Sequence, residues 1–417
     1  MTRIVIVGAG LAGLRAAERL RELGHRDEIV ILNAEDSMPY HRPALSKQFL
    51  TGEANAADLR IDPLEELDAI WRLATPVHRL EPKRRILHLP GGEELGYDGL
   101  IIATGVEARR VNGGQHGNPR VVTLRTIADG KRLQRALAGN RLPVVVLGSG
   151  FTGCEIASSL RHMSREVTLI GRSKSLMAGL LGPQLGSQLV ELHRYHGVDL
   201  ALGAGIEEWS LGSRSVTVRL STGRVIEAAC VVVAVGSVPS IAWLRDSGVP
   251  VDEGVLCGPT CHVDGFDDIV AAGDVAQWPN LRFDRAPRRV EHWTNAIEMG
   301  RAAAESLLAG KGSAAPFLPV PRFWSEQHGM RIQAAGVPAL GGDRVALREL
   351  STGGRSVTGY VRSGRLVGVV GFNSSNAVLA YGDELARQAP LAANEAPSPA
   401  RRSRRLSFTE AVRAGNR

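Results

Sequence analysis

The sequence predicts an α/β protein with two Rossmann-like parallel-sheet domains and a smaller α+β domain towards its C-terminal end. Two observations support this fold class. A short apolar strand, a glycine-rich turn and a helix occur twice, and the first glycines of the two copies lie 140 residues apart. From about residue 317, short alternating stretches separated by glycine turns indicate a partly antiparallel sheet.

Each copy of the pattern predicts a buried strand, a helix and a second strand. In the first copy these cover residues 4–7, 14–23 and 29–32, and in the second copy residues 143–147, 154–163 and 167–170. Three further apolar strands are expected to end in glycine, at residues 97–105, 230–236 and 269–273, and two antiparallel strands are expected at residues 355–361 and 365–372.

The first turn has the glycine spacing of a dinucleotide-binding site. Gly8 permits the tight turn, Gly10 allows a pyrophosphate to approach the backbone, and Gly13 allows close packing of helix on strand. The helix N-terminus adds partial positive charge beside the phosphates. Glu35 follows the next strand, 22 residues beyond Gly13, where a carboxylate can hold ribose hydroxyls. Leu11 and Ala12, inside the turn, are included in the candidate site.

The second turn repeats the glycines as Gly148, Gly150 and Gly153 but differs beyond its second strand. There the sequence contains Arg172 and Lys174 and no acid. An arginine at this place can pair with a 2′-phosphate, which a carboxylate would repel. The two sites together predict FAD in the first and NADPH in the second. NADH remains the alternative if the two cations only belong to a solvated turn.

The composition fits a folded protein of 417 residues that is rich in glycine. Glycine contributes 48 residues, against a usual level of roughly 7%, and phosphate turns explain part of the excess. Segment 389–417 has six arginines and two glutamates and is expected to be a flexible basic tail, so the net charge of +7 says little about the folded body. No apolar run reaches about 18 residues, and a strand at residue 4 leaves no room for a signal peptide. We therefore expect a cytoplasmic protein without a membrane span.

These patterns divide the chain into four parts. We expect a discontinuous FAD-binding domain from residues 1–112 and 246–316, with an NAD(P)H-binding domain, residues 113–245, between its two segments. Residues 317–388 are expected to form the α+β domain, and residues 389–417 the tail.

Several motifs, taken in order along the chain, resemble the oxygenase-coupled NAD(P)H:ferredoxin reductases of the putidaredoxin reductase type. These enzymes belong to the flavoprotein superfamily with two dinucleotide-binding domains that includes glutathione reductase. The resemblance extends from residue 4 to about residue 385. The motifs are the segment Pro-Tyr-His-Arg-Pro-Ala-Leu-Ser-Lys at residues 39–47, Glu155, Ala-Ala-Gly-Asp at 271–274, Glu-His-Trp at 291–293 and Phe-Trp-Ser-Glu-Gln at 323–327.

The resemblance implies a role for particular residues. Lys47 is expected near the reactive edge of the flavin, and Glu155 is expected to pair with it and to orient the nicotinamide. Arg42 is expected to reach the FAD pyrophosphate, and Asp274, placed between a strand and a helix, to bind the ribityl chain or a phosphate-bound water. Trp324 and Trp293 are expected to pack at the flavin. The other expected cofactor-binding residues are Ala103, Thr104, Gly105, Phe151, Thr152, Gly236, Gly273, Glu291 and His292.

The four cysteines distinguish between relatives within the superfamily. Residues 36–50 contain no cysteine, Cys154 has no partner nearby in the sequence, and Cys257 and Cys261 stand where the family has no redox pair. A dithiol mechanism is therefore not expected. A zinc site is not expected either, because Cys257, Cys261 and His262 lack a matching second half.

The predicted function is electron transfer from NAD(P)H through FAD to a [2Fe–2S] ferredoxin that serves a cytochrome P450 or a Rieske-type oxygenase. The alternatives are another flavin oxidoreductase of the superfamily without redox cysteines, or a redox sensor resembling apoptosis-inducing factor. We expect a monomer or weak homodimer, and no nucleic-acid partner, because the tail contains a single aromatic residue. The arginines of segment 282–289 are a candidate docking patch for an acidic ferredoxin.

Overall fold

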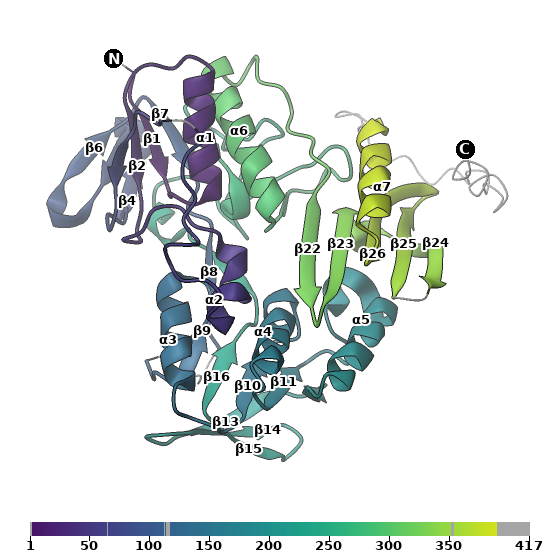
Figure 1. Ribbon diagram of the computed structural model, residues 1–417. Helices are drawn as coiled ribbons and strands as arrows, with labels where there is room; N and C mark the ends of the chain where they lie inside the picture. Colours follow the sequence, from purple (N-terminus) through teal and green to yellow (C-terminus); the bar gives the residue numbers. More distant parts are fainter. Residues whose placement is uncertain (1, 65, 112, 114–116, 352–353, 390–417) are drawn as a thin grey trace.

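The computed structural model describes residues 2–64, 66–111, 113, 117–351 and 354–389. It contains two parallel sheets and one antiparallel sheet, each of five strands and each with one or more helices against it (Figure 1). The predicted fold class is confirmed. The predicted tail lies outside the described residues, apart from its first residue.

The first parallel sheet combines strands from the beginning and the middle of the chain. Its order is β19-β7-β1-β2-β3, and the apolar strands pair in register, with Val7 opposite both Leu32 and Ile102. Helices α1 and α6 lie side by side next to this sheet (Figure 1). They approach closely because Gly300 of α6 has no side chain: a Cβ there would lie 2.3 Å from the carbonyl oxygen of Ala12. The elements are β1 (Ile4–Val7), α1 (Leu11–Glu22), β2 (Ile29–Leu32), β3 (Ile70–Arg72), β7 (Gly99–Ile102), β19 (Ile269–Ala271) and α6 (Trp293–Ala309).

The second parallel sheet repeats this arrangement with the order β12-β11-β10-β16-β9. Its central strands are buried along their length, as a sheet with both faces covered requires. The elements are β9 (Val121–Thr123), α3 (Ile127–Leu137), β10 (Val144–Leu147), α4 (Phe151–His162), β11 (Val167–Gly171), α5 (Ala178–Tyr195), β12 (Asp199–Leu202) and β16 (Cys230–Val233).

Both helices that follow the glycine turns begin three residues earlier than the sequence predicts. The expected starts were residues 14 and 154, and the observed ones are Leu11 and Phe151. The physical reason is that Gly10 and Gly150 already have extended backbone and serve as the N-caps. Their carbonyl oxygens accept the first helical hydrogen bonds, so the free N–H groups of the first turn lie next to the glycines.

The C-terminal part is an antiparallel sheet of order β22-β23-β26-β25-β24 with α7 against it (Figure 1). Strand β22 also contacts α4 of the second sheet, and residues from both parts share one apolar core, among them Leu181, Phe323 and Tyr360. The elements are β22 (Arg322–Gln327), β23 (Met330–Gly336), β24 (Asp343–Ser351), β25 (Arg355–Arg362), β26 (Arg365–Phe372) and α7 (Ser375–Arg387).

Smaller elements connect these three sheets. Strands β4, β5 and β6 form one small sheet, β13, β14 and β15 a second, and β18, β20 and β21 a third, while β8 pairs with β17. No helix within the described residues is sufficiently long and apolar to cross a bilayer. The bounds are α2 (Gln48–Thr51), β4 (Arg79–Glu81), β5 (Ile86–His88), β6 (Glu94–Gly96), β8 (Val106–Ala108), β13 (Ile206–Leu211), β14 (Val216–Leu220), β15 (Val225–Ala228), β17 (Ser237–Pro239), β18 (Val255–Leu256), β20 (Ala276–Trp278) and β21 (Arg288–Arg289).

Candidate functional site

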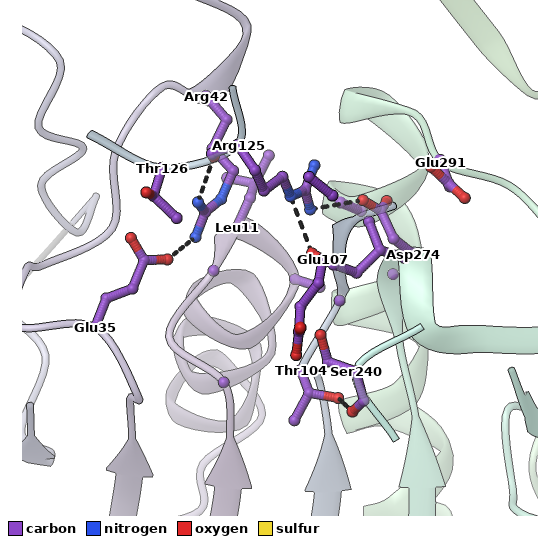
Figure 2. A pocket seen from close by; sticks show the side chains of 18 of the residues that line it. Leu11, Glu35, Arg42, Thr104, Glu107, Arg125, Thr126, Ser240, Asp274 and Glu291 are labelled. Carbon is purple, nitrogen blue, oxygen red and sulfur yellow. Dashed lines mark hydrogen bonds and ion pairs between the residues drawn. The ribbon is translucent and has the colours of Figure 1, made fainter. Parts of the chain in front are cut away.

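A cavity of about 1080 Å³ opens where the ends of the first sheet meet α4 and β22. Its lining comes from segments that are far apart in the sequence, including the turn before α1, the segment before α2 and the first turn of α4. Figure 2 shows charged side chains from several of these segments converging above α1. Most of the predicted site residues line it: Gly8, Gly10, Leu11, Ala12, Glu35, Arg42, Lys47, Ala103, Thr104, Gly105, Phe151, Thr152, Glu155, Gly273, Asp274, Glu291, His292, Trp293 and Trp324.

The first glycine turn has the steric features that a dinucleotide needs. A Cβ on Gly8 would lie 2.2 Å from the carbonyl oxygen of Ala103, and one on Gly13 would lie 2.0 Å from that of Gly8. Gly10, by contrast, has nothing within 4 Å of its Cβ position and faces the cavity. Two glycines therefore permit backbone packing, while the middle one leaves space for a pyrophosphate. This turn fits FAD.

Glu35, Arg42 and Tyr40 form a polar cluster at one end of the cavity. The guanidinium of Arg42 donates to Glu35 Oε1 at 2.5 Å, and the Tyr40 hydroxyl donates to the other carboxylate oxygen at 2.8 Å. The same guanidinium lies over the Tyr40 ring, 4.6 Å from its centre. Burial raises the pKa of Tyr40, so its hydroxyl stays a proton donor. Glu35 is thereby held beside the cavity with its side chain fixed on two sides. Figure 2 shows its contact with Arg42.

Arg125 links this cluster to Asp274. Its backbone oxygen accepts from Arg42 at 3.1 Å, and its guanidinium donates to Asp274 Oδ2 at 3.2 Å (Figure 2). Burial raises the pKa of Asp274, and the nearby Arg125 opposes that shift. The expected helix after Asp274 is absent at this place: Asp274 lies in a single 3₁₀ turn, Gly273–Val275, and strand β20 follows directly. That expectation was wrong because the chain returns at once to a small sheet.

Lys47 and Glu155 meet across the cavity floor as an ion pair, with 2.6 Å between Nζ and Oε2. Their side chains are only 16% and 10% exposed. Ser46 donates to the same carboxylate oxygen at 2.7 Å, and Ser325 donates to the other oxygen at 2.8 Å. The carboxylate therefore has three donors, which offset the cost of burying a charge. The predicted pair is present, and its two members come from α4 and the residue before α2.

His292, Trp293 and Trp324 form the aromatic side of the cavity. The Nδ1 atom of His292 is buried and has no hydrogen-bond partner, although most such atoms have one. Burial lowers the pKa of this imidazole to about 4, so the ring is neutral. A buried polar atom without a partner beside an open cavity is a position for a ligand's hydrogen bond.

The second glycine turn has the same steric pattern but does not line this cavity. A Cβ on Gly148 would lie 2.0 Å from the carbonyl oxygen of Ala234, and one on Gly153 would lie 1.9 Å from that of Gly148. Gly150 is open, as Gly10 is. Arg172 follows β11 and is exposed. Of the predicted site residues, Gly13, Gly148, Gly150, Gly153, Arg172 and Gly236 are outside the cavity lining.

The sequence reasoning missed four polar residues of this site. Tyr40 and Ser46 lie inside the segment 39–47 that was recognised, and Ser325 lies in the segment 323–327, so their positions beside assigned residues were an available signal. Arg125 gave no such signal, since its partner Asp274 is 149 residues away in the sequence.

The candidate docking patch needs correction. Arg282 donates to the backbone oxygens of Leu318 and Ala386, and so ties the antiparallel sheet domain to its neighbour. Arg289 is only 16% exposed and pairs with Glu291 at 2.7 Å. Arg288, which is exposed, pairs with Asp284 inside the same segment. Arg282 and Arg289 therefore stabilise the fold, and segment 282–289 is not a free basic patch.

All four cysteines lie within the described residues and are buried free thiols: Cys154, Cys230, Cys257 and Cys261. Burial raises the pKa of each thiol, to about 12 for Cys230. Within the described residues, no three His, Cys, Asp or Glu side chains are grouped as a metal ion would require.

Comparison with protein families gives two matches that together span most of the chain. Residues 2–300 match the family described as pyridine nucleotide-disulphide oxidoreductase. Residues 322–406 match the reductase C-terminal family. The first match ends within α6, and the second begins at the first residue of β22, where the antiparallel sheet begins.

Individual relatives are similar over most of their length. The ferredoxin–NAD(+) reductase component of the p-cumate 2,3-dioxygenase system of Pseudomonas putida is 34% identical, covering 82% of this chain and 83% of that protein. Rubredoxin-NAD(+) reductase of Pseudomonas putida is 33% identical, covering 80% and 86%. The crystal structure of the covalent putidaredoxin reductase–putidaredoxin complex aligns with a TM-score of 0.86 and 25% identity, covering 93% of this chain and 94% of that chain.

Proposed function

Because the chain belongs to the pyridine nucleotide-disulphide oxidoreductase family, we propose that it is an FAD-dependent NAD(P)H:ferredoxin reductase. In this proposal it supplies electrons to a [2Fe–2S] ferredoxin that serves a cytochrome P450 or another oxygenase. The observation that best supports it is the mostly buried Lys47–Glu155 pair, which lines the same cavity as the first glycine turn. The proposal includes the domain division 1–112 with 246–316, 113–245 and 317–388, and a monomer or weak homodimer.

The residues around the cavity have separate tasks in this proposal. The open backbone at Gly10 and the first turn of α1 hold the pyrophosphate, and Glu35 holds ribose hydroxyls. Arg42 and Asp274 are available for the phosphates and the ribityl chain, and His292 Nδ1 offers one unused hydrogen-bonding atom. Bound FAD supplies the chemistry, accepting a hydride and giving up electrons one at a time.

Lys47 and Glu155 orient the reactants and control charge. With FAD bound, the ammonium of Lys47 would stabilise negative charge at the flavin, and Glu155 would hold the ammonium in place and orient the nicotinamide. Phe151 and Thr152, in the same first turn of α4, also line the cavity and exclude water from the contact. Since the pair is mostly buried, its field is screened less than that of a surface pair.

The second turn is proposed to bind NADPH in preference to NADH. The basis is Arg172, exposed at the end of β11, together with Lys174 two residues later. A 2′-phosphate needs a cation at this position. Arg172 has the planar donors for bidentate binding.

The proposal is tested with purified protein, and each electron acceptor is assayed with and without the others. The protein is expected to contain FAD, or to take it up, and to reduce cytochrome c rapidly only when a [2Fe–2S] ferredoxin is added. Colourless protein that cannot be reconstituted would end the FAD assignment. Equal turnover without any ferredoxin would end the acceptor assignment.

A second acceptor class has a specific basis, because one relative is a rubredoxin reductase at 33% identity. The two acceptors differ in their iron centre, so a direct competition separates them. The main proposal expects a larger kcat/KM with the [2Fe–2S] protein than with rubredoxin. A larger kcat/KM with rubredoxin would transfer the assignment to that class.

A further inference from the structure

A continuous set of hydrogen bonds extends from Glu155 through the protein interior to the boundary between α5 and the antiparallel sheet. We name it the Glu155 network and define it as Ser325, Gln327, His193 and His328. Ser325 Oγ donates to Glu155 Oε1 at 2.8 Å, and Gln327 Nε2 donates to Ser325 Oγ at 3.0 Å. His193 Nε2 lies 3.0 Å from Gln327 Oε1, and His328 Nε2 lies 3.1 Å from His193 Nδ1.

The network has one direction, which the carboxylate determines. Glu155 only accepts, so Ser325 must give it its single hydroxyl proton. Ser325 can then only accept from the Gln327 amide nitrogen, which leaves the amide oxygen facing His193. His193 must therefore hold its proton on Nε2 and accept on Nδ1. Every donor in the network points towards Glu155, and this favours the carboxylate in one orientation.

Three of the four polar side chains of the network are deeply buried, so their hydrogen bonds are required to offset the cost of burying them. Ser325, Gln327 and His193 are each 0% exposed, and polar side chains at this depth are uncommon unless hydrogen-bonded. Burial lowers the pKa of His193, and burial together with His193, His196 and Arg161 lowers that of His328 to about 3. Both rings are neutral at physiological pH, so the direction of the network is stable.

His328 has an unusual backbone that keeps its ring in the network. It and Gly329 form the turn between β22 and β23, and both have positive φ, 51° and 75°. Asn and Gly are the usual residues in such a turn, and a histidine there costs conformational energy. Its backbone N–H donates to Ser158 Oγ of α4 at 2.7 Å, and its ring stacks on His196 at 4.3 Å. The strained turn is thus anchored to α4 and α5 together.

We propose that the Glu155 network positions the carboxylate that orients the nicotinamide, so that the antiparallel sheet sets the geometry of hydride transfer. This inference rests on the proposed function. It assigns positioning roles to Ser325 and Gln327 of β22 and to His193 of α5. It also explains why β22 packs against α4, because Glu155 belongs to α4 and its second oxygen is held from β22.

The main test compares Gln327→Leu with Tyr360→Phe. Tyr360 donates a buried hydrogen bond to the Leu181 oxygen of α5 at 2.7 Å, across the same boundary, but does not reach Glu155. Gln327→Leu is expected to slow flavin reduction at saturating NAD(P)H by roughly tenfold, with unchanged FAD content and unchanged Kd for NAD(P)H. Tyr360→Phe is expected to leave that rate unchanged. Equal rates in both variants, whether normal or reduced, would overturn the positioning role.

A second pair of variants applies if Gln327→Leu fails to fold. His193→Leu removes the donor to Gln327, whereas His193→Gln retains an N–H at a similar reach. The proposal expects a slower reduction rate in the first and recovery in the second. The absence of any difference between them contradicts it.

A measurement on the unmodified protein needs neither turnover nor cofactor. Selective ¹⁵N labelling of histidine and NMR at neutral pH are expected to show His193 and His328 protonated on Nε2 alone. A proton on Nδ1 of His193 would overturn the network's direction. If the protein binds no FAD or does not oxidise NAD(P)H, the proposed function fails, while this measurement still decides on the network.

Discussion

The two glycine turns are nearly superimposable in their contacts and yet differ in their surroundings. Gly8 donates to the Leu32 oxygen at 2.8 Å, and Gly148 donates to the Ile170 oxygen at 2.8 Å. The clashes that a Cβ would cause at Gly8 and Gly13 recur at Gly148 and Gly153 within about 0.2 Å. Two residues after the third glycine, however, the first copy has Arg15 and the second has Glu155. Arg15 pairs with Glu18 on its own helix, whereas Glu155 pairs with Lys47 from the other half of the molecule.

The comparison distinguishes the role of the glycine turn, which is common to both copies, from the roles of the residues that follow it. The steric pattern is the same in both copies, so in the proposed function it accounts for what the two dinucleotide sites have in common. In the proposed function, the chemistry depends on the residue two positions beyond the third glycine of each turn. In the proposed function, nucleotide preference depends on the residues after the second strand. Leu32 pairs with Val7 in the first copy, and Ile170 pairs with Leu147 in the second. Three residues beyond them the first copy has Glu35 and the second has Ser173, which lies between Arg172 and Lys174.

The largest expected effect comes from adding a methyl group at the third glycine of each turn. Gly13→Ala brings Cβ against the Gly8 oxygen at 2.0 Å, where only backbone can yield. We expect loss of FAD and a destabilisation of about 1–3 kcal/mol, as overpacking typically gives. Gly153→Ala, at 1.9 Å from the Gly148 oxygen, is expected to retain FAD and to lose NAD(P)H binding. Flavin-to-protein ratio, Tm and NAD(P)H titration measure these outcomes.

The matched controls are Gly10→Ala and Gly150→Ala. Neither added Cβ has an atom within 4 Å, so the unfolding free energy of the apoprotein is expected to stay unchanged while ligand binding weakens. Retention of stoichiometric FAD by Gly13→Ala would contradict the role of close packing.

The next largest effect is expected at Arg15 and Glu155, which lie two positions beyond the third glycine of each turn. Glu155→Gln removes the charge that balances Lys47, and we expect flavin reduction to slow by roughly 100-fold, a loss typical for a preorganised polar group in an active site. Arg15→Gln, at the matching position of α1, is expected to leave the reduction rate unchanged, because its partner is Glu18. Stopped-flow absorbance gives both rates, and equal slowing in the two variants would refute the comparison.

Much of this comparison was predictable from the sequence, and particular residues show why the remainder was not. The repeated glycines and the apolar strands are local patterns, so both parallel sheets were predicted, and the strands at Ile4–Val7 and Ile29–Leu32 were predicted with correct bounds. Arg282 looked like a surface cation because the backbone oxygens that it binds, those of Leu318 and Ala386, are 36 and 104 residues away in the sequence. Buried polar residues such as Gln327 were equally hidden, since a strand pattern gives burial but not the hydrogen-bond partner.

A smaller effect is expected at the end of β11. Arg172→Asp places a carboxylate where a 2′-phosphate is proposed to bind, and we expect the ratio of kcat/KM for NADPH to that for NADH to fall at least about tenfold. Ser173→Asp, at the position that matches Glu35, is expected to change the ratio in the same direction. Steady-state kinetics with both nucleotides measure it. A wild-type protein that already strongly prefers NADH would disprove the role of Arg172.

The smallest effect concerns an ion pair that joins α1 to α6. Glu22 binds Arg301 at 2.6 Å and Arg19 at 2.8 Å, and these two guanidinium groups hold the pKa of Glu22 at about 2, below its ordinary 4.5. A lowered carboxyl pKa stabilises the fold above pH 4.5, and this contribution disappears as the pH falls from 4.5 towards 2. Because Glu22 is 38% exposed, solvent screening limits the contribution to below about 1 kcal/mol.

Glu22→Gln should therefore lower the free energy of unfolding slightly at pH 7 and make progressively less difference as the medium becomes acidic. Urea unfolding at several pH values measures this. Glu191→Gln is the matched control, since Glu191 pairs with Arg194 of the same helix, α5, and both side chains are largely exposed. If both variants lose the same stability with the same pH dependence, the α1–α6 pair adds nothing beyond an ordinary surface pair. In that case the close packing at Gly300 and the separate Arg19–Glu305 ion pair would be what joins the two helices.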